Sequence, residues 1–498
     1  MMETLILVRD QGRLLIQDAR RRRFGSLFVP IRRSYLLVMP GILLAAGILG
    51  FAVRNNFTMI FDAFIVSAVS LYLAYDVIGR AAPLRTSTVL ALTLGLGYGL
   101  GTLNTWYTLP RAGKTLAEFF NIDAADLAQA MAGILIAIAL MLAIGEALEK
   151  PIWGEEFRID FHNRAISIIS LGALFRFLTV ASGHAAGFGS QANIHQGHIG
   201  AIATLSSDVE TPLLALAFCM ALNARSRWKR WYLYGLTFVL FLLDFPNGRR
   251  AMIYGMLLLI MATRLGRFRI ALSPLKKIAI MVVVGGVLYF FTLAFYYFRV
   301  AGYTLVNPTM GERISAVITL VKRKGGGKVD QAFTSNVERR TFILTFLAQL
   351  VGYTDSLPAA HGQDLFNQFT FALPSVLYPG KDVNFTEEGL ANTQFGAHFP
   401  DQPNSIFTAG VVDFGVFGIL VYPLLFVLLF RVFIEFISET VPLFPACFII
   451  LLILGTLLEP ETEPAAYFIA IREGLLVGGA VWALYTMPSL QLTKGTRI

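Results

Sequence analysis

Charged side chains are scarce in this sequence, and that scarcity excludes most classes of protein. Asp, Glu, Lys and Arg make up only 15% of the 498 residues, whereas hydrophobic residues make up 56%. A soluble domain has roughly 25% charged residues, and a disordered chain needs the opposite balance of charge and hydrophobicity. Lipid is therefore the expected solvent for most of the chain.

Cysteine and cofactor-binding motifs are also scarce. The two cysteines, Cys219 and Cys447, both lie inside apolar runs, so neither a disulfide framework nor a cysteine-based metal site is expected. The sequence contains no Walker, Rossmann, nucleophile-elbow or HExxH pattern. His195 and His198 have a spacing that can bind metal, but no third ligand is indicated. We therefore expect no nucleotide, metal or other cofactor.

Long apolar runs predict an all-α, polytopic bundle of transmembrane helices. A hydrocarbon core about 30 Å thick needs about 20 residues of helix. Runs of that length give about twelve candidate spans, at Ser34–Val53, Thr58–Gly79, Ser87–Leu109, Leu127–Ala147, Ala165–Ala181, Val209–Ala224, Trp231–Asn247, Ala251–Arg264, Leu275–Phe298, Ser405–Val432, Val441–Leu458 and Ala465–Met487.

The distribution of Lys and Arg orients this predicted bundle. Short cytoplasmic loops are rich in these residues, and the pattern fits best when both termini are cytoplasmic. The run Arg20–Arg23 and the cluster Arg225–Arg230 then lie on one side, beside anionic lipid. The formal net charge of +9 is thereby explained by the membrane, and we expect no nucleic-acid partner.

The spans divide the chain into five parts. In chain order these are a basic cytoplasmic N-terminal segment, spans one to nine, a large external loop, spans ten to twelve and a cytoplasmic tail, at residues 1–33, 34–298, 299–404, 405–487 and 488–498. Within the loop, Met310–Val321 and Val337–Val351 are predicted helices. The sequence shows no internal repeat and no symmetric pair of broken helices, which repeat-built transporters usually have.

A short helical hairpin is the main candidate site. The segment Trp231–Arg264 must cross twice around a turn at Phe245–Arg250, where Pro, Asn and Gly favour reversal. Each arm has about 14 to 17 residues, or roughly 21–25 Å of helix, so the turn should lie below the outer surface in a wetted cavity. Arg249 and Arg250 at the start of the second arm favour a diphosphate ligand. Alternatively the pair snorkels to the interface or pairs with Asp244.

Other ionisable residues on the predicted external side could surround the same cavity. The candidate ligands for diphosphate or sugar are Arg176, Arg299, Arg339, Arg340 and Arg472. An internal ion pair is the alternative for each of them. The segment from His398 to Asp401 offers an imidazole and a carboxylate that could accept a proton from an attacking hydroxyl, although a plain surface loop is the alternative. An acidic turn at 459–463 precedes the last span.

Two segments carry a resemblance to a known family. Asn247-Gly-Arg-Arg-Ala-Met-Ile-Tyr-Gly-Met-Leu257 is a turn with arginines before an apolar helix. Pro403-Asn-Ser-Ile-Phe-Thr-Ala-Gly-Val-Val-Asp-Phe-Gly-Val-Phe-Gly418 opens a span after the large loop. In this order around one loop, the segments resemble those of the bacterial O-antigen and exopolysaccharide repeat-unit polymerases (the Wzy type), and more distantly those of the O-antigen ligases.

This resemblance implies a metal-independent glycosyltransferase of the bacterial inner membrane. Such proteins join undecaprenyl-diphosphate-linked oligosaccharides on the periplasmic face, so the implied partners are that lipid-linked oligosaccharide, membrane lipid and a chain-length regulator. It also implies that Arg249 or Arg250 binds the diphosphate. Ligase-like members have a His before the span that begins near Asn404, whereas Pro403 stands there in this chain and the nearest His is His398. A lipid-linked oligosaccharide flippase or a ligase-like transferase stays as an alternative.

Overall fold

Every regular element in the described part of the chain is a helix. In the computed structural model the described residues are 29–79, 84–108, 115–149, 151–152, 163–181, 197–245, 255–259, 274–302, 310–322, 327, 329, 343–354, 356–374, 376–380, 386–396, 398 and 402–487. The expected all-α class is therefore confirmed for these residues. Because each helix satisfies its backbone hydrogen bonds internally, this is the architecture that lipid tolerates.

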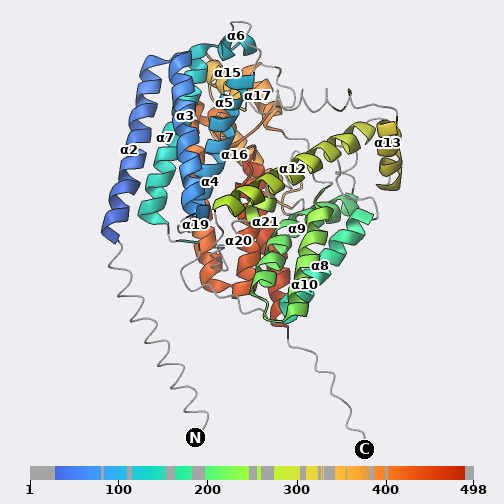
Figure 1. The fold of residues 1–498 in the computed structure, drawn as a ribbon. Coiled ribbons are helices and arrows are strands. Elements are labelled where there is room, and N and C mark those ends of the chain that lie inside the picture. The colour runs from blue at the N-terminus through green and yellow to red at the C-terminus, as the bar shows by residue number, and fades with distance from the viewer. Residues whose placement is uncertain are drawn as a thin grey trace, which may run out of the picture.

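The N-terminal helices form one bundle at the left of Figure 1. They are α2 (Val29–Val53), α3 (Asn56–Ala74) with a π-helical turn at Tyr75–Gly79, α4 (Thr86–Gly95), the π-helical segment η2 (Leu96–Leu100), α5 (Gly101–Thr108), α6 (Leu116–Phe120) and α7 (Ala124–Leu148). Helix α7 is the centre of this bundle, since α2, α3, α4, α15 and α19 all pack against it. Its alanines and glycines allow this close approach.

A second group of helices lies on the right of Figure 1. It comprises α8 (Asn163–Ala181), α9 (Gly197–Asn223), α10 (Arg227–Leu243), α12 (Pro274–Gly302) and α13 (Met310–Lys322). Helices α8, α9 and α10 pack against one another, while α12 runs outward to α13. The predicted loop helix Met310–Val321 is confirmed by α13.

The C-terminal helices fill the space between these two groups. They are α15 (Leu344–Thr354), α16 (Gln363–Ala372), α17 (Glu387–Phe395), α18 (Ile406–Phe414), a 3-10 turn at Gly415–Phe417, α19 (Gly418–Thr440), α20 (Leu443–Leu457) and α21 (Pro464–Thr486). Helix α20 packs on α21 and α9, and α16 packs on α21 and α18. Helix α15 covers the later part of the second predicted loop helix, Val337–Val351, whose first residues, 337–342, lie outside the described residues.

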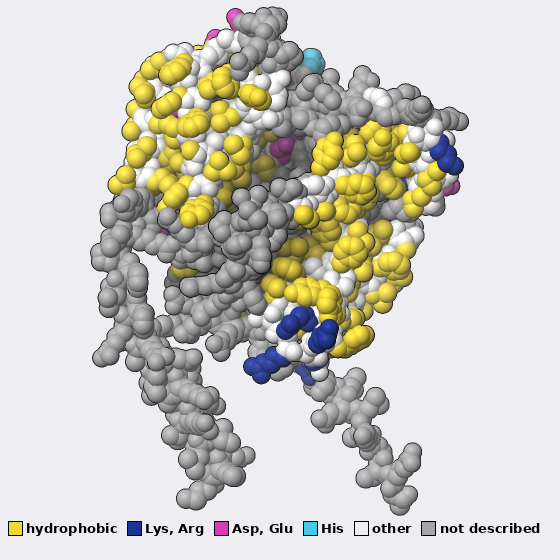
Figure 2. All heavy atoms as spheres, in the orientation of Figure 1, with side chains coloured by type: hydrophobic (Ala, Val, Ile, Leu, Met, Phe, Trp, Pro, Cys, Tyr) yellow, Lys and Arg dark blue, Asp and Glu magenta, His cyan; other side chains and the backbone are white. Residues whose placement is uncertain are grey.

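Six described helical segments are long and apolar enough to cross a membrane, at Asn56–Val77, Thr86–Thr108, Ala124–Leu148, Asn163–Ala181, Ile406–Thr440 and Pro464–Thr486. Each of the other predicted spans also coincides with a helix, except Ala251–Arg264, which lies mostly outside the described residues. Yellow side chains cover the visible face of both groups of helices (Figure 2). The apolar exterior and the six segments together define an all-helical membrane protein.

The two ends of the bundle differ in charge. Lys and Arg side chains gather at the lower end of the α8–α10 group in Figure 2, where α9 gives way to α10 and the residues from Arg225 to Arg230 are exposed. The start of α2 and the end of α21 lie on this lower side, whereas α6, α15 and α17 lie at the upper end (Figure 1). The lower end is thus the one that the charge distribution predicts to be cytoplasmic.

The predicted span Ser405–Val432 falls within the candidate span Ile406–Thr440, but a sharp reversal divides it into two helices that form a hairpin. Helix α18 ends at Gly415, whose φ of 61° lies in the left-handed region that favours glycine. The chain then reverses, and α18 packs back against the start of α19. The backbones meet at Gly410 and Gly418, where a side chain on either residue would overlap the other's carbonyl group.

Replacing Gly418 by alanine should destabilise the protein strongly. The new Cβ would overlap backbone atoms of Gly410, which cannot rotate away as a side chain would, so we expect a loss of at least about 1–3 kcal/mol, the usual cost of overpacking. Thermal unfolding in detergent would measure it. Gly479→Ala in α21 is the matched control, because nothing lies within 4 Å of that Cβ position. Equal midpoints for the two variants would contradict the hairpin contact.

Candidate functional site

The short helix α16 is held by polar side chains from two other helices, and these contacts build the candidate site. Its N-terminal residue Gly362 gives no side-chain cap. Instead Asp413, at the end of α18, accepts hydrogen bonds from the backbone N–H groups of Asp364 (2.8 Å) and Leu365 (2.9 Å). The Tyr422 hydroxyl donates to the same carboxylate. A carboxylate at a helix N-terminus satisfies free N–H groups and complements the helix dipole.

The other end of α16 is held by a cation. Arg472 of α21 donates from Nη1 to the carbonyl oxygen of Ala372 at 2.7 Å. A positive charge at a helix C-terminus is favourable because it complements the helix dipole. Between the two ends, Gln368 accepts a hydrogen bond from the backbone N–H of Ala465 at 3.0 Å. That bond satisfies one of the free N–H groups at the start of α21. Helix α16 is therefore fixed at both ends and at its middle.

A second polar pair lies where α18 and α21 begin. Asn404 donates from Nδ2 to Oε1 of Glu463 at 2.6 Å. The neighbouring Ser405 caps α18 and is hydrogen-bonded to the Tyr98 hydroxyl at 2.6 Å. Tyr98 lies near the middle of the candidate span Thr86–Thr108. Helix α18 therefore begins within the bundle rather than at its upper surface, and the adjacent pair Asn404–Glu463 lies at a similar depth.

Burial raises the pKa of two carboxyl groups in this site, those of Asp364 and Glu463. Asp364 is fully buried, and burial together with the charges of Asp413 and Glu463 raises its pKa well above the ordinary value. The pKa of Glu463 is also raised, by burial and by the charge of Glu388, while the hydrogen bond from Asn404 opposes the shift. Carboxyl groups of this kind hold a proton more readily than exposed ones.

Figure 2 shows acidic side chains set back between the apolar surface of the upper bundle and that of the helices to its right. Helix α16 lies in the upper half of the molecule in Figure 1. We name the residues Asp364, Gln368, Asn404, Asp413, Glu463 and Arg472 the α16 polar cluster. Carboxyl groups with perturbed pKa values are typical of functional sites.

Two of the arginines predicted from the sequence are bonded within the protein. Arg176 is buried, and its Nε donates to Glu210 at 2.6 Å while Nη2 donates to the Leu243 carbonyl at 3.4 Å. Arg472 donates to Glu473 as well as to α16. For both Arg176 and Arg472, the structure therefore shows the alternative of an internal ion pair. Arg299 lies half-buried in the last turn of α12.

The main predicted site lies outside the described residues. These residues are Arg249, Arg250, Arg339, Arg340 and Asp401, so their roles stay predictions. Asp244, which ends α10 just before the predicted turn, is buried. His398 is exposed, as a surface loop residue would be.

Sequence reasoning missed most of the α16 polar cluster. Asp413 stands within the Pro403–Gly418 segment, and a carboxylate inside an apolar run is costly enough in lipid to mark a specific partner. Glu463 belongs to the acidic turn noted before the last span. Asp364 and Gln368 gave no signal, because their partners lie far away in the chain.

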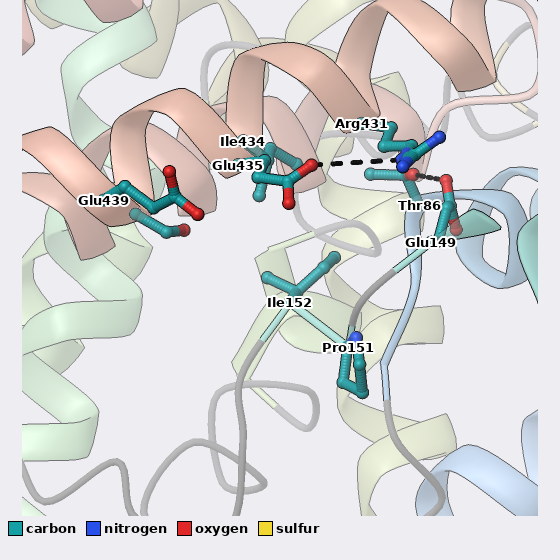
Figure 3. Close-up of a pocket in the computed structure, with 9 residues that line it drawn as sticks. Thr86, Glu149, Pro151, Ile152, Arg431, Ile434, Glu435 and Glu439 are labelled. Atoms are coloured by element: carbon teal, nitrogen blue, oxygen red, sulfur yellow. Dashed lines mark hydrogen bonds and ion pairs between the residues drawn. The ribbon is translucent and has the colours of Figure 1, made fainter.

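A small pocket of about 110 Å³ lies at the lower end, between the start of α4, the end of α7 and α19 (Figure 3). Its lining residues are Thr86, Glu149, Pro151, Ile152, Arg431, Ile434, Glu435, Ser438 and Glu439. Glu149 accepts hydrogen bonds from the Ser87 hydroxyl and backbone N–H, so it stabilises the N-terminus of α4. Ligand pockets are usually about 300 Å³ or larger, so this one is small for a ligand site.

Within the described ranges, no group of three or more His, Cys, Asp or Glu side chains could hold a metal ion. The α16 polar cluster is instead rich in single hydrogen bonds between carboxyl, amide and guanidinium groups. Comparison with known proteins adds no relative: no family model matches the chain, and no curated protein or solved structure is found to be similar to it.

Proposed function

We propose that this protein is a membrane glycosyltransferase that polymerises undecaprenyl-diphosphate-linked oligosaccharide repeat units. The observation that supports it best is the placement of α16. Part of the segment predicted as the large external loop packs against α18 and α21 and brings carboxyl groups into the bundle. A loop that contributes such groups to a membrane-embedded bundle is suited to a lipid-linked sugar.

The proposed chemistry needs no nucleotide. A lipid diphosphate is a good leaving group, and its developing charge needs guanidinium stabilisation. Arg249 and Arg250 supply that stabilisation in this proposal, with Arg339 and Arg340 in the loop near the sugars. The hydroxyl of an acceptor sugar attacks the anomeric carbon of the donor. The proposal places the protein in a bacterial inner membrane with about twelve spans, both termini cytoplasmic and a chain-length regulator as partner.

A flippase for the same lipid-linked oligosaccharide is the second candidate. It is favoured by the start of α18 and the Asn404–Glu463 pair at depth, because transporters place substrate sites at interrupted helices near the middle of the membrane. The two candidates predict different products.

Incubating the purified full-length protein with lipid-linked repeat units, without nucleotide, should give a ladder of longer lipid-linked products. Gel separation of the products measures chain growth, and a fluorescent donor in vesicles measures movement between leaflets. The matched control is the same vesicle without protein. A ladder supports the polymerase, whereas movement of intact lipid with no new glycosidic bond would replace it by the flippase.

A further inference from the structure

Glu463 is the carboxyl group of the α16 polar cluster that is only half-buried, and one of its oxygens is free for a ligand. It is the residue that precedes α21, yet it makes no cap with its own helix. The backbone N–H of Ala465, at the start of α21, donates to the side chain of Gln368 rather than to Glu463. Only Oε1 of Glu463 is held, by Asn404. The carboxylate is therefore oriented by one amide and has its second oxygen available.

The neighbouring carboxyl groups are unsuitable for the same role. Asp413 is fully buried, and its two oxygens already accept from three donors. Asp364 is fully buried and its raised pKa favours the protonated form. Glu388 accepts the backbone N–H of Gln402 at 3.2 Å. Glu463 is only half-buried, so a substrate can reach it.

Asn404 adds a second, independent observation that points to a ligand. Its side chain is 6% exposed, and its Oδ1 atom has no hydrogen-bond partner although its Nδ2 is bonded to Glu463. A buried acceptor without a donor costs free energy. A hydroxylated ligand beside Glu463 would provide that donor. Two adjacent acceptors, one on the amide and one on the carboxylate, match the neighbouring hydroxyl groups of a sugar ring.

We propose that Glu463, oriented by Asn404, binds the acceptor sugar and takes the proton from its attacking hydroxyl. This inference rests on the proposed function. In the step, the hydroxyl O–H bond breaks and its proton passes to Glu463, while the oxygen forms a bond to the anomeric carbon of the donor. The bond from that carbon to the diphosphate breaks, and its electron pair leaves with the lipid diphosphate. Glu463 then returns the proton to water.

The surroundings of Glu463 favour proton acceptance. The titratable groups that face it are Asp364 from α16 and Glu388 from α17, and Glu461 lies in the same turn. Burial and the negative charge of Glu388 raise the pKa of Glu463. A general base works best when its pKa approaches the working pH, so this carboxylate is a stronger base than an exposed glutamate.

The first test is Glu463→Gln in the full-length protein, assayed with lipid-linked repeat units. Glutamine keeps an oxygen for Asn404 but cannot take a proton, so we expect kcat to fall by about 100-fold or more while KM and the thermal midpoint stay near the wild-type values. Glu461→Gln, two residues away in the same turn, is the matched control and should keep full turnover.

The second test is the pH profile of kcat/KM. A base acts only when deprotonated, so the rate should fall as the pH drops through the pKa of Glu463. Removing the negative charge of Glu388 by Glu388→Gln lowers that pKa, so the acidic limb should move to lower pH. If Glu463 had only a structural role, the acidic limb of the kcat/KM profile would stay at the same pH in Glu388→Gln.

The outcomes separate this inference from the proposed function. Wild-type protein that makes no ladder would remove both. A wild-type ladder with Glu463→Gln turning over within threefold of wild type, or with the acidic limb unmoved in Glu388→Gln, would overturn the role of Glu463 alone. A wild-type ladder that collapses in Glu463→Gln, but not in Glu461→Gln, supports it.

Discussion

Replacing Arg249 and Arg250 together by alanine should abolish chain growth and leave folded protein in the membrane. In the proposed mechanism the two guanidinium groups stabilise the charge that develops on the departing diphosphate. Removing one such donor typically costs about 10²–10³ in kcat, so the loss of both should bring product below detection. The ladder assay with purified protein measures the effect, and the elution volume in detergent reports folding.

The control for this double variant is Arg225→Ala with Arg227→Ala. Both residues are exposed at the lower end, between α9 and α10, on the side predicted to be cytoplasmic. The control removes the same formal charge away from the proposed site and should leave the ladder intact. Full-length polymer from the Arg249/Arg250 variant would eliminate the arginine pair from the mechanism, while equal loss in both variants would point to a general effect of charge.

Replacing Asp413 by alanine should have the largest effect on stability among single changes in the α16 polar cluster. The substitution leaves two backbone N–H groups of α16 and the Tyr422 hydroxyl without their acceptor. An unpaired buried donor costs about 1–3 kcal/mol, so we expect a loss of roughly 3 kcal/mol or more. Thermal unfolding in detergent, followed by tryptophan fluorescence or precipitation, measures it.

Asp364→Asn is the matched control for Asp413. Asp364 lies in the same cluster and is equally buried, but its raised pKa favours the neutral form, which an amide resembles. We therefore expect this variant to unfold within a few degrees of the wild type, and Asp413→Asn to unfold well below it. The same midpoint for the two asparagine variants would show that Asp413 does not anchor α16 as a carboxylate.

The helical class and the positions of most helices could be predicted from the sequence because they depend on local composition. Apolar runs such as Leu127–Ala147 must form helices in lipid. Helix α7, from Ala124 to Leu148, contains that whole run and is only a few residues longer. The cluster Arg225–Arg230 likewise marked one end of the bundle. These features need no knowledge of distant residues.

The hairpin of α18 and α19 was not predicted, although its signals are local. The continuous apolar run from Ser405 predicts one span, because hydropathy alone does not indicate where the chain reverses its direction. The reversal depends on the positive φ of Gly415 and on the close approach of Gly410 to Gly418. Glycine is common in transmembrane helices, so its presence alone did not indicate a break.

The sequence by itself determined that this chain belongs in lipid, that it is helical and that its charge is unequally placed, because each of these follows from composition over short windows. Only the tertiary structure decided which polar groups meet. Asp413 reaches α16 across 49 residues and Asn404 reaches Glu463 across 59. Arg472 contacts Ala372 across 100. The desolvation cost of buried charge forces such groups to find partners, but which partner each one finds depends on how the helices pack.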